Sequence, residues 1–429
     1  MNRTLVKNLN NNMGKEVRIQ GWLHRVRKLG KIAFLFLRDR SGVVQCVVNT
    51  KEIDIKGLRV ESVIEINGEV TESGAKNEEV EVQVSAMRVL NEVNYELPME
   101  INKENIEASL DVMIHNRVLS FRNRKVAAIF KIQECISKSF AEFLRGEGFK
   151  EIFTPKIVKE GTEGGTELFE VKYFNEKAYL AQSPQFYKQM MVSSGYERVF
   201  EIGHVYRAES HDTKRHINEY VSLDLEMGFI QDEYEIMELE ERLIRFIIHN
   251  ICNECKEEVQ LLEANIPIIN EEIPKMKMSE AIEILKTEYN KTNLERDLDP
   301  EGEKLISEYV KEKYGSDFVF LTHYPQEKRP MYTMPAPNGE TKSFDLIFRG
   351  LEITTGGQRI HSYEVLKEKM IETGLNPESF EGYLSAFKYG MPPHGGLAIG
   401  LERITASFLG IENVRETTMF TRDKNRLTP

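Results

Sequence analysis

The spacing of apolar residues changes part-way along this 429-residue chain, and that change limits the folds open to it. Over the first hundred residues, apolar and polar side chains alternate in short runs such as "EVRIQGWLHRVR" and "IAFLFLRDRSGVVQCVVN". This alternation indicates strands with one buried face. From about residue 116, apolar residues recur at helical spacing, as in "KVAAIFKIQECISKSFAEFL". More than one domain is therefore predicted, in keeping with the length of the chain.

The two patterns predict different architectures. Residues 1–95 are expected to form a small barrel of the OB type, because short strands carrying basic and aromatic residues are typical of barrels that hold single-stranded nucleic acid. Residues 96–115, which are polar and include Pro98, are predicted to be a linker. Residues 116–429 mix helices with strands joined by short turns or long excursions, which favours a mainly antiparallel sheet flanked by helices. The predicted fold class is α+β.

Several elements are predicted within residues 116–429. Residues 199–229 are predicted to be two strands joined by a polar loop, and "KEIFTPKIV" to be a strand. A short helix is predicted with Ser183 as its N-cap, and a long amphipathic helix from about Glu233 to Val259. In "PHGGLAIGLERITASFLG", a glycine-rich strand is predicted to run into a helix.

Charge and cysteine content narrow the classes of function. The formal net charge is −12, yet residues 1–40 hold ten Lys and Arg against two acids, a local +8 that leaves −20 for the rest. A basic N-terminal segment in an otherwise acidic chain suits a protein that binds a polyanion at one place. A solvent-exposed basic face without a ligand explains the charge distribution equally well. No apolar run approaches the length of a membrane span. Four cysteines without a secretory signal favour free thiols in the cytoplasm.

Three strand-like segments carry clusters of charged side chains. The clustered residues are Arg207, Glu209, Arg215 and His216 in the first segment, Asp345, Glu352 and Arg359 in the second, and Glu402 and Arg403 in the third. Arginine suits phosphate oxygens, and paired carboxylates suit a Mg²⁺ ion that bridges phosphates, so bound ATP with Mg²⁺ is predicted. Neither a P-loop nor a dinucleotide-binding glycine motif is present. Salt bridges on solvent faces are the alternative, which three matched clusters disfavour.

The same segments carry a family resemblance. "FEIGHVYRAE" with "RHINE" resembles the second signature motif of the class II aminoacyl-tRNA synthetases, "GGLAIGLER" the third, and "FKEIFTPKI" the first. Within that class, "AQSPQFYKQMM", "SFDLIFRGLEITTGGQRIH" and "FTRDKNRLTP" resemble the aspartyl-tRNA synthetases of the archaeal and eukaryotic type. The interval between the second and third motifs is too short for the extra domain of the usual bacterial form. The resemblance covers nearly the whole chain.

The resemblance implies an activity and a nucleotide site. Such enzymes react L-aspartate with ATP to form aspartyl-adenylate and pyrophosphate, and then transfer the aspartyl group to tRNA-Asp with release of AMP. Arg207 is implied at the α-phosphate and Arg403 at the γ-phosphate, and these two are the catalytic residues. The remaining ATP contacts implied are Glu209 and His216 at the adenine end, Arg215 at the outer phosphates, and Glu352 through the metal. Asp345, Glu352 and Thr355 are implied as the Mg²⁺ site, although relatives often have serine at the position of Thr355.

The family resemblance also implies which residues select the amino acid. Lys188 and Arg359 match the residues that bind the side-chain carboxylate of aspartate in this family. An arginine guanidinium that binds a carboxylate discriminates against the uncharged side-chain amide of asparagine. Glu163 and Gln185 match the partners of the α-ammonium group, with Asp224 in support. Taken alone, Lys188 has the pattern of an ordinary exposed lysine on a helix.

The N-terminal barrel is implied to bind the anticodon. Phe34 and Gln45 match residues that stack on and read the central anticodon base, although the strand pattern alone favours a core position for Phe34. His24, in "GWLH", matches relatives that accept tRNA-Asn as well as tRNA-Asp, which makes relaxed tRNA choice a hypothesis. A homodimer is implied around Pro155 of the first motif.

Two other functions stay open at this stage. An asparaginyl-tRNA synthetase shares the fold and the charged hairpin, but is not expected to keep the lysine and arginine pair. A non-catalytic synthetase relative that binds tRNA is the alternative of a different class, and such relatives usually lose a motif arginine.

Overall fold

A computed structural model of the chain describes residues 2–74, 79–162, 167–210 and 213–429. The chain divides into two compact units, Met1–Ala108 and Ser109–Pro429. The division falls within residues 96–115, where the linker was predicted. In these described ranges, no helix combines the length and the apolar character that crossing a bilayer requires.

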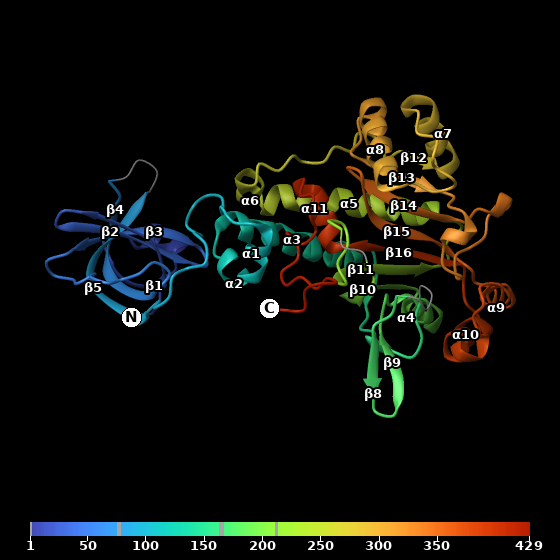
Figure 1. Cartoon of the computed structure of the whole chain (residues 1–429), viewed down its shortest axis with the longest axis horizontal. Coiled ribbons are helices and arrows are strands. Elements are labelled where there is room, and N and C mark those ends of the chain that lie inside the picture. The colour runs from blue at the N-terminus through green and yellow to red at the C-terminus, as the bar shows by residue number, and fades with distance from the viewer. Residues whose placement is uncertain (1, 75–78, 163–166, 211–212) are drawn as a thin grey trace. The chain divides into compact units, whose positions relative to one another are not determined.

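The first unit is a closed barrel of strands in the order β1-β2-β3-β5-β4 (Figure 1). Its strands are β1 (Glu16–Leu29), β2 (Ile32–Asp39), β3 (Gly42–Asn49), β4 (Val63–Glu72) and β5 (Val80–Asn91). Buried and more exposed side chains alternate along β1 and β2, so that Val17, Ile19 and Leu35 point into the core. This arrangement confirms the predicted OB-type barrel.

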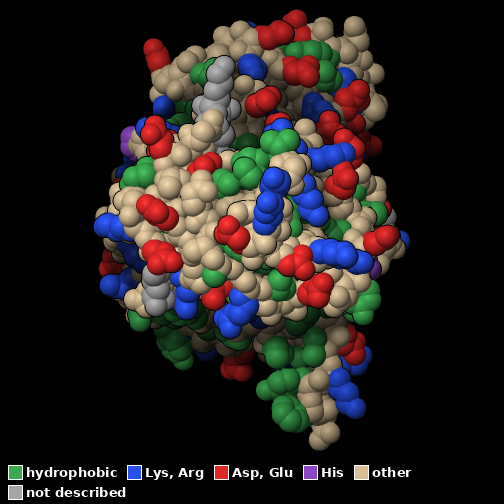
Figure 2. Space-filling view, turned by 90° about the vertical axis from the view of Figure 1, so that its left-hand side faces the viewer, with side chains coloured by type: hydrophobic (Ala, Val, Ile, Leu, Met, Phe, Trp, Pro, Cys, Tyr) green, Lys and Arg blue, Asp and Glu red, His purple; other side chains and the backbone are tan. Residues whose placement is uncertain are grey.

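The surface of the molecule is not uniformly basic where the sequence concentrates its basic residues. Figure 2 shows Lys and Arg side chains lying among Asp and Glu side chains rather than in one continuous patch. In the barrel, for example, the exposed guanidinium of Arg88 has Nη2 3.3 Å from Glu65 Oε1. On the face that Figure 2 shows, charge by itself therefore does not mark a nucleic-acid surface.

The second unit is built on a sheet of strands in the order β12-β13-β14-β15-β16-β11-β10-β6. Its strands are β6 (Lys150–Glu151), β10 (Arg198–Tyr206), β11 (Glu219–Gly228), β12 (Lys275–Lys277), β13 (Phe318–Thr322), β14 (Ser343–Phe348), β15 (Leu351–Arg359) and β16 (His394–Gly400). Neighbours are antiparallel except β6 with β10 and β12 with β13. A smaller sheet, β7-β9-β8, comprises β7 (Ile157–Val158), β8 (Glu170–Tyr173) and β9 (Glu176–Leu180).

Helices flank the large sheet, as Figure 1 shows. They are α1 (Leu110–His115), α2 (Arg117–Ser120), α3 (Arg124–Gly146), α4 (Gln185–Met191), α5 (Tyr234–Glu254), α6 (Lys256–Leu261), α7 (Met278–Tyr289), α8 (Pro300–Tyr314), α9 (Tyr363–Glu372), α10 (Glu381–Lys388) and α11 (Leu401–Leu409). Helix α3 packs against α5, α6 and α11. Its apolar face, with Ile132, Ile136 and Phe140, belongs to the largest core cluster of the unit. The mainly antiparallel sheet with flanking helices confirms the predicted α+β class.

Some predicted elements differ from those observed. The continuous strand expected at "KEIFTPKIV" is two short strands, β6 and β7, because the intervening segment with Pro155 does not pair. The helix expected from Glu233 to Val259 is interrupted at Cys255, where the backbone leaves helical geometry (φ −120°, ψ 32°). Helix α4 begins at Gln185 rather than directly after Ser183, although the Ser183 hydroxyl accepts a bond from the Gln185 N–H (3.3 Å).

The buried side chain of Arg117 connects the start of the second unit to the C-terminal segment by hydrogen bonds. The Arg117 side chain is 2% exposed and lies against the rings of Phe121 and Phe130. Its guanidinium donates to the carbonyl oxygens of Met419 (2.9 Å), Glu416 (3.1 Å) and Thr418 (2.6 Å). Burial lowers its pKa to about 10, so the group stays charged at neutral pH.

We expect Arg117→Met to lower the free energy of unfolding by about 3 kcal/mol, because three buried or partly buried carbonyl groups lose a charged donor. Chemical denaturation followed by circular dichroism measures the change. The matched control is Arg124→Met, which removes an exposed arginine at the start of α3. Equal stability of the two variants would contradict a fastening role for Arg117.

Candidate active site

Antiparallel pairing in the middle of the sheet brings together residues that are far apart in the sequence. Strand β16 lies between β11 and β15, and its Ala398 is opposite Asp224 on one side and Thr355 on the other. The β10–β11 hairpin, predicted as two strands with a polar connection, pairs from Tyr206 with Glu219 to Arg198 with Met227. Two adjoining pockets, here called pocket A and pocket B, open over these strands.

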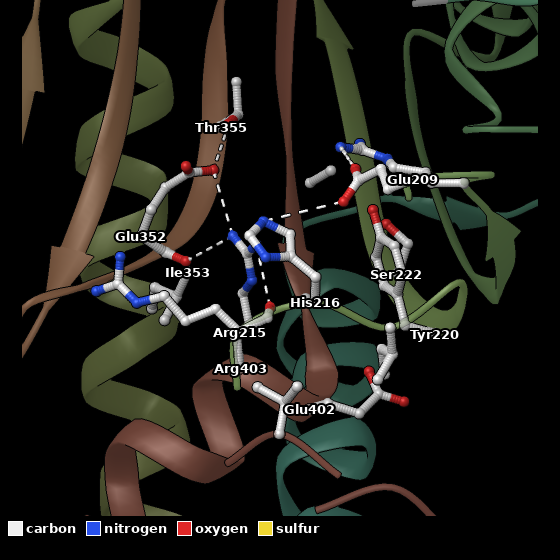
Figure 3. Close-up of a pocket in the computed structure, with 15 residues that line it drawn as sticks. Glu209, Arg215, His216, Tyr220, Ser222, Glu352, Ile353, Thr355, Glu402 and Arg403 are labelled. Atoms are coloured by element: carbon white, nitrogen blue, oxygen red, sulfur yellow. Dashed lines mark hydrogen bonds and ion pairs between the residues drawn. The ribbon is translucent and has the colours of Figure 1, made fainter. Parts of the chain in front are cut away.

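Pocket A is lined by the β10–β11 hairpin, β15, β16 and the start of α11 (Figure 3). Three guanidinium groups face it, from Arg207, Arg215 and Arg403. Arg207 lies just beyond β10, where its N–H donates to the Asn218 carbonyl (2.9 Å), so the hairpin backbone fixes its position. Its guanidinium lies 5.7 Å from the centre of the Tyr220 ring. Three cations around one opening favour a ligand that carries several negative charges.

Arg403 joins α11 to β15 within pocket A. Its Nη1 donates to the Glu352 carbonyl oxygen at 3.1 Å and lies 3.7 Å from the Glu352 carboxylate. The Thr355 hydroxyl donates to the same carboxylate at 3.0 Å, as the dashed lines in Figure 3 show. The Glu352 carboxylate is thus oriented by neighbours on β15 and α11.

Further charged groups of pocket A, those of Arg215, Glu209 and His216, also lie beside polar partners. Arg215 Nη1 lies 2.8 Å from Glu303 Oε2, on α8. Burial raises the pKa of Glu303 to about 7, an effect that Arg215 opposes and Glu352 reinforces. His216 lies 3.9 Å from Glu209, and the Thr213 hydroxyl lies 2.6 Å from His216 Nδ1. These pairs fix the polar groups of the pocket before any ligand arrives.

Pocket B contains a buried chain of alternating charges. Lys188, from α4, is 1% exposed and its Nζ lies 3.0 Å from Asp224 Oδ1 and 3.4 Å from Glu226 Oε2. The other oxygen of Glu226 accepts from Arg359 Nε at 3.1 Å. Burial opposes ionisation of Glu226, but Arg359 and Lys188 together hold its pKa below the ordinary value. Gln185, also on α4, lies 3.4 Å from the Glu226 carboxylate.

The two pockets share part of their lining. Arg207, Tyr220, Ser222 and Thr355 line both. A ligand in pocket A and a ligand in pocket B would therefore meet beside the Arg207 guanidinium.

A further buried carboxylate, that of Asp345, lies near the residues that the two pockets share. Asp345 is 5% exposed, sits opposite Thr355 across the β14–β15 pair, and has Oδ2 2.8 Å from Arg329 Nη2. Among the described residues, its buried Oδ1 has no hydrogen-bond partner. Burial raises the pKa of Asp345 to about 6, which Arg329 opposes and Glu352 reinforces. No group of three His, Cys, Asp or Glu side chains within the described ranges could hold a metal alone.

The structure brings together the described residues that were predicted to bind ATP and the amino acid, whereas the predicted metal ligand Asp345 lines neither pocket. Those lining pocket A are Arg207, Glu209, Arg215, His216, Glu352, Thr355 and Arg403, and those lining pocket B include Gln185, Lys188, Asp224 and Arg359. The alternative that Lys188 is an ordinary exposed lysine is wrong. Glu163 lies outside the described residues.

The three residues predicted to read the anticodon lie on the barrel. Phe34 is partly exposed between the buried residues Ala33 and Leu35, so it points outward and the core alternative is wrong. Gln45 donates to Glu81 Oε2 at 2.8 Å. His24 lies at an irregularity in the β1–β2 pairing, with Nδ1 3.0 Å from Arg38 Nη1. Their contacts with RNA stay a prediction.

The sequence patterns did not identify Glu226, which is buried behind pocket B, or the charged residues Glu327, Lys328 and Arg329 in its lining. Glu226 lies two residues after Asp224 on β11, so the period of two placed both on one face of the sheet and was a usable signal. Arg329 lies in an irregular segment before β14, where its partner Asp345 is distant in sequence. No local pattern could have identified it.

Comparison with known proteins agrees with this geometry. The model of the family described as "tRNA synthetases class II (D, K and N)" matches residues 109–424, and that described as "OB-fold nucleic acid binding domain" matches residues 17–90. The chain belongs to the class II tRNA synthetases. Within this class, the synthetase is 48% identical over 427 residues to "Aspartate--tRNA(Asp/Asn) ligase" of Thermus thermophilus, with both chains fully covered.

Two further relatives place the synthetase more finely. It is 47% identical over 436 residues to the protein of the same name from Deinococcus radiodurans, covering 100% of this chain and 99% of the relative. The crystal structure of asparaginyl-tRNA synthetase from Pyrococcus horikoshii with asparaginyl-adenylate superposes with a TM-score of 0.93 at 30% identity, with both chains fully covered. The fold is thus shared across both specificities, while the higher identity is to the aspartate enzymes.

A carboxyl group is buried close to the site. Glu240, on α5, is 0% exposed, and its oxygens have no hydrogen-bond partner of acceptable geometry among the described residues. Burial raises its pKa to about 8, and the nearby Asp345 adds to the shift. Glu240 is therefore largely protonated at neutral pH.

This shift makes stability depend on pH. A carboxyl whose native pKa lies above its ordinary value of 4.5 binds more protons in the native state, so the free energy of unfolding falls as the pH rises from 4.5 to about 8. We expect Glu240→Gln to match the parent protein near pH 5 and to be more stable by about 3 kcal/mol at pH 8. Denaturation at both pH values measures this. Glu238→Gln, on the exposed side of α5, is the control, and a pH-independent effect of Glu240→Gln would contradict the assignment.

Proposed function

We propose that this synthetase is an aspartate–tRNA ligase: it activates L-aspartate with ATP and transfers the aspartyl group to tRNA-Asp. The observation that carries the proposal is pocket B, where the buried cations Lys188 and Arg359 lie beside Glu226 next to the arginine-lined pocket A. The second unit is the catalytic domain and the barrel is the anticodon-binding domain. The names of the relatives with 47% and 48% identity support the activity, and the two matching family models support the roles of the two units.

ATP occupies pocket A. Arg207 binds the α-phosphate, where negative charge grows as the aspartate carboxylate attacks, and it is suited to this because it lines both pockets. Arg403 binds the γ-phosphate, and Arg215 binds the outer phosphates. Glu209 and His216 lie at the adenine end. No side chain acts as a nucleophile, because orientation and fixed charge supply the catalysis.

Mg²⁺ accompanies ATP. Asp345 and Glu352 would hold it with support from the Thr355 hydroxyl, and the buried Asp345 Oδ1, which has no hydrogen-bond partner of acceptable geometry among the described residues, fits such an ion. When bound, the ion neutralises charge on the phosphates.

Aspartate occupies pocket B. Arg359 and Lys188 bind its side-chain carboxylate, and Gln185, Asp224 and Glu163 bind or support its α-ammonium group. A carboxamide in place of the carboxylate would bring no negative charge to these cations and would point an N–H donor at groups that are themselves donors, which favours aspartate over asparagine. Arg207 and Arg403 both line pocket A, which favours an enzyme over a non-catalytic relative.

The barrel binds the anticodon of tRNA-Asp. Phe34 stacks on the central base and Gln45 reads it. His24 supports the acceptance of tRNA-Asn as well, and the relatives from Thermus thermophilus and Deinococcus radiodurans carry both tRNAs in their names.

The enzyme acts in the cytoplasm, and its four cysteines, all free thiols, fit that location.

Charging with labelled aspartate and labelled asparagine, on purified tRNA-Asp and tRNA-Asn in parallel, tests the function. We expect aspartate on both tRNAs and asparagine on neither, with all charging lost when EDTA removes divalent ions. Aspartate on tRNA-Asp alone would keep the catalytic assignment and remove the role of His24. Charging with asparagine would favour the asparaginyl alternative, and no charging would favour a tRNA-binding protein.

The enzyme forms a homodimer through the region of the first motif. Large apolar side chains are exposed there, with Phe153 at 86% and Phe174 at 81%. Phe174 lies between β8 and β9, the hairpin labelled in Figure 1. Burying such a surface against a second copy is favourable. Light scattering on a sizing column is expected to give about twice the 49.7 kDa chain mass. Phe153→Asp should then shift the protein towards monomer, whereas a monomeric parent would refute the dimer.

A further inference from the structure

A chain of buried hydrogen bonds lies behind pocket B and has no part in the ligand contacts proposed above. It consists of Tyr383 on α10, Gln189 on α4 and His394 at the start of β16, which are 5%, 0% and 0% exposed. The Tyr383 hydroxyl donates to Gln189 Oε1 at 2.9 Å. Gln189 Nε2 lies 2.7 Å from His394 Nε2, and His394 Nδ1 lies 2.9 Å from the Pro392 carbonyl oxygen. We call these three side chains the relay.

The direction of every bond in the relay is determined by its ends. A carbonyl oxygen only accepts, so His394 Nδ1 carries the hydrogen and Nε2 is an acceptor. Gln189 then donates through Nε2, which leaves its Oε1 to accept from Tyr383. Burial lowers the pKa of His394 to about 4, which keeps the ring neutral. The relay therefore has one arrangement, and each buried polar atom named in it is satisfied.

The relay connects the two elements that carry the cations of pocket B. Gln189 follows Lys188 directly on α4, and Gln185 lies one helical turn earlier. His394 is opposite Arg359 in the β15–β16 pairing, and Arg359 Nη2 donates to the Gly396 carbonyl (2.9 Å) on the same strand. The bond between Gln189 and His394 thus spans from the helix of Lys188 to the strand beside Arg359.

We propose that His394, acting through Gln189, is a positioning residue for amino-acid selection. It holds α4 against β16 so that Lys188 and Arg359 keep the separation at which one carboxylate satisfies both. The three relay side chains touch neither pocket as lining, so their effect passes through the position of Lys188. The ring of Phe186 on α4 stacks on that of Tyr383, with ring centres 4.2 Å apart, so apolar packing keeps the helix folded without the relay. The hydrogen bonds of the relay then set the position of α4 along β16.

This proposal rests on the proposed aspartate site, and ATP–pyrophosphate exchange with purified enzyme tests the two separately. Gln189→Met keeps the volume and removes both bonds of the amide. We expect it to raise the KM for aspartate about tenfold, with the KM for ATP unchanged, and to lower the preference for aspartate over asparagine. Tyr383→Phe, which removes one bond of the relay, should change the same quantity in the same direction but less.

Two further variants separate positioning from general damage to the fold. Gln133→Met makes the same substitution at another buried glutamine, which donates to the Thr417 carbonyl (2.7 Å), and should lower stability without changing the KM for aspartate. His394→Leu should reproduce the aspartate KM of Gln189→Met, and the double variant should be no worse than either, because residues that act as a unit are not additive.

The outcomes are distinct. If the parent enzyme does not exchange with aspartate, the proposed function fails. If the parent exchanges and Gln189→Met keeps the parental KM for aspartate and the parental preference over asparagine, the positioning role fails. An equal rise in the KM for ATP, or the same rise in Gln133→Met, would also overturn it, because either would show general damage instead of a selective effect on pocket B.

Discussion

The pairing of β16 with β11 and β15 is the constraint on which both pockets depend. It places Asp224, Thr355 and Ala398 side by side although they come from three separate parts of the chain. The strands approach so closely that a Cβ atom on Gly396 would collide with the Leu225 carbonyl oxygen and the Glu226 carboxylate. Glycine at this position is therefore required by the pairing itself, because any side chain would push β16 away from β11.

The buried charges near this pairing are stable because each lies among opposite charges. Lys188, Asp224, Glu226 and Arg359 form an alternating chain beside pocket B, in which each successive pair of charged atoms lies within 3.4 Å. Removing one member would leave a neighbour charged and unpaired, which costs about 3–5 kcal/mol. The same arrangement holds the cations in place before a ligand binds, and a site held in this way loses little energy to reorganisation. Fold stability and ligand selection thus share the same contacts.

Prediction from sequence succeeded where the signal was local. The β10–β11 hairpin and the strand-to-helix step from β16 into α11 were predicted because alternation and helical spacing lie within short segments. It failed where distant contacts decided the outcome. The segment around Pro155 has strand-like residues but pairs only at its two ends, and the helix expected to reach Val259 breaks at Cys255. Glu226 had a readable signal in its spacing from Asp224, whereas Arg329 had none.

The sequence alone determined the order of elements, the division between a barrel and a mixed sheet, and most of the charged residues that line the pockets. These follow from periodicity and from motifs that lie within single segments. Only the tertiary structure decided which charges pair, that Lys188 is buried and that Phe34 faces outward. It also decided the direction of the hydrogen bonds through Gln189 and His394. The physical reason is that burial and partner choice depend on strand register and packing between residues some two hundred positions apart, as with Gln189 and His394.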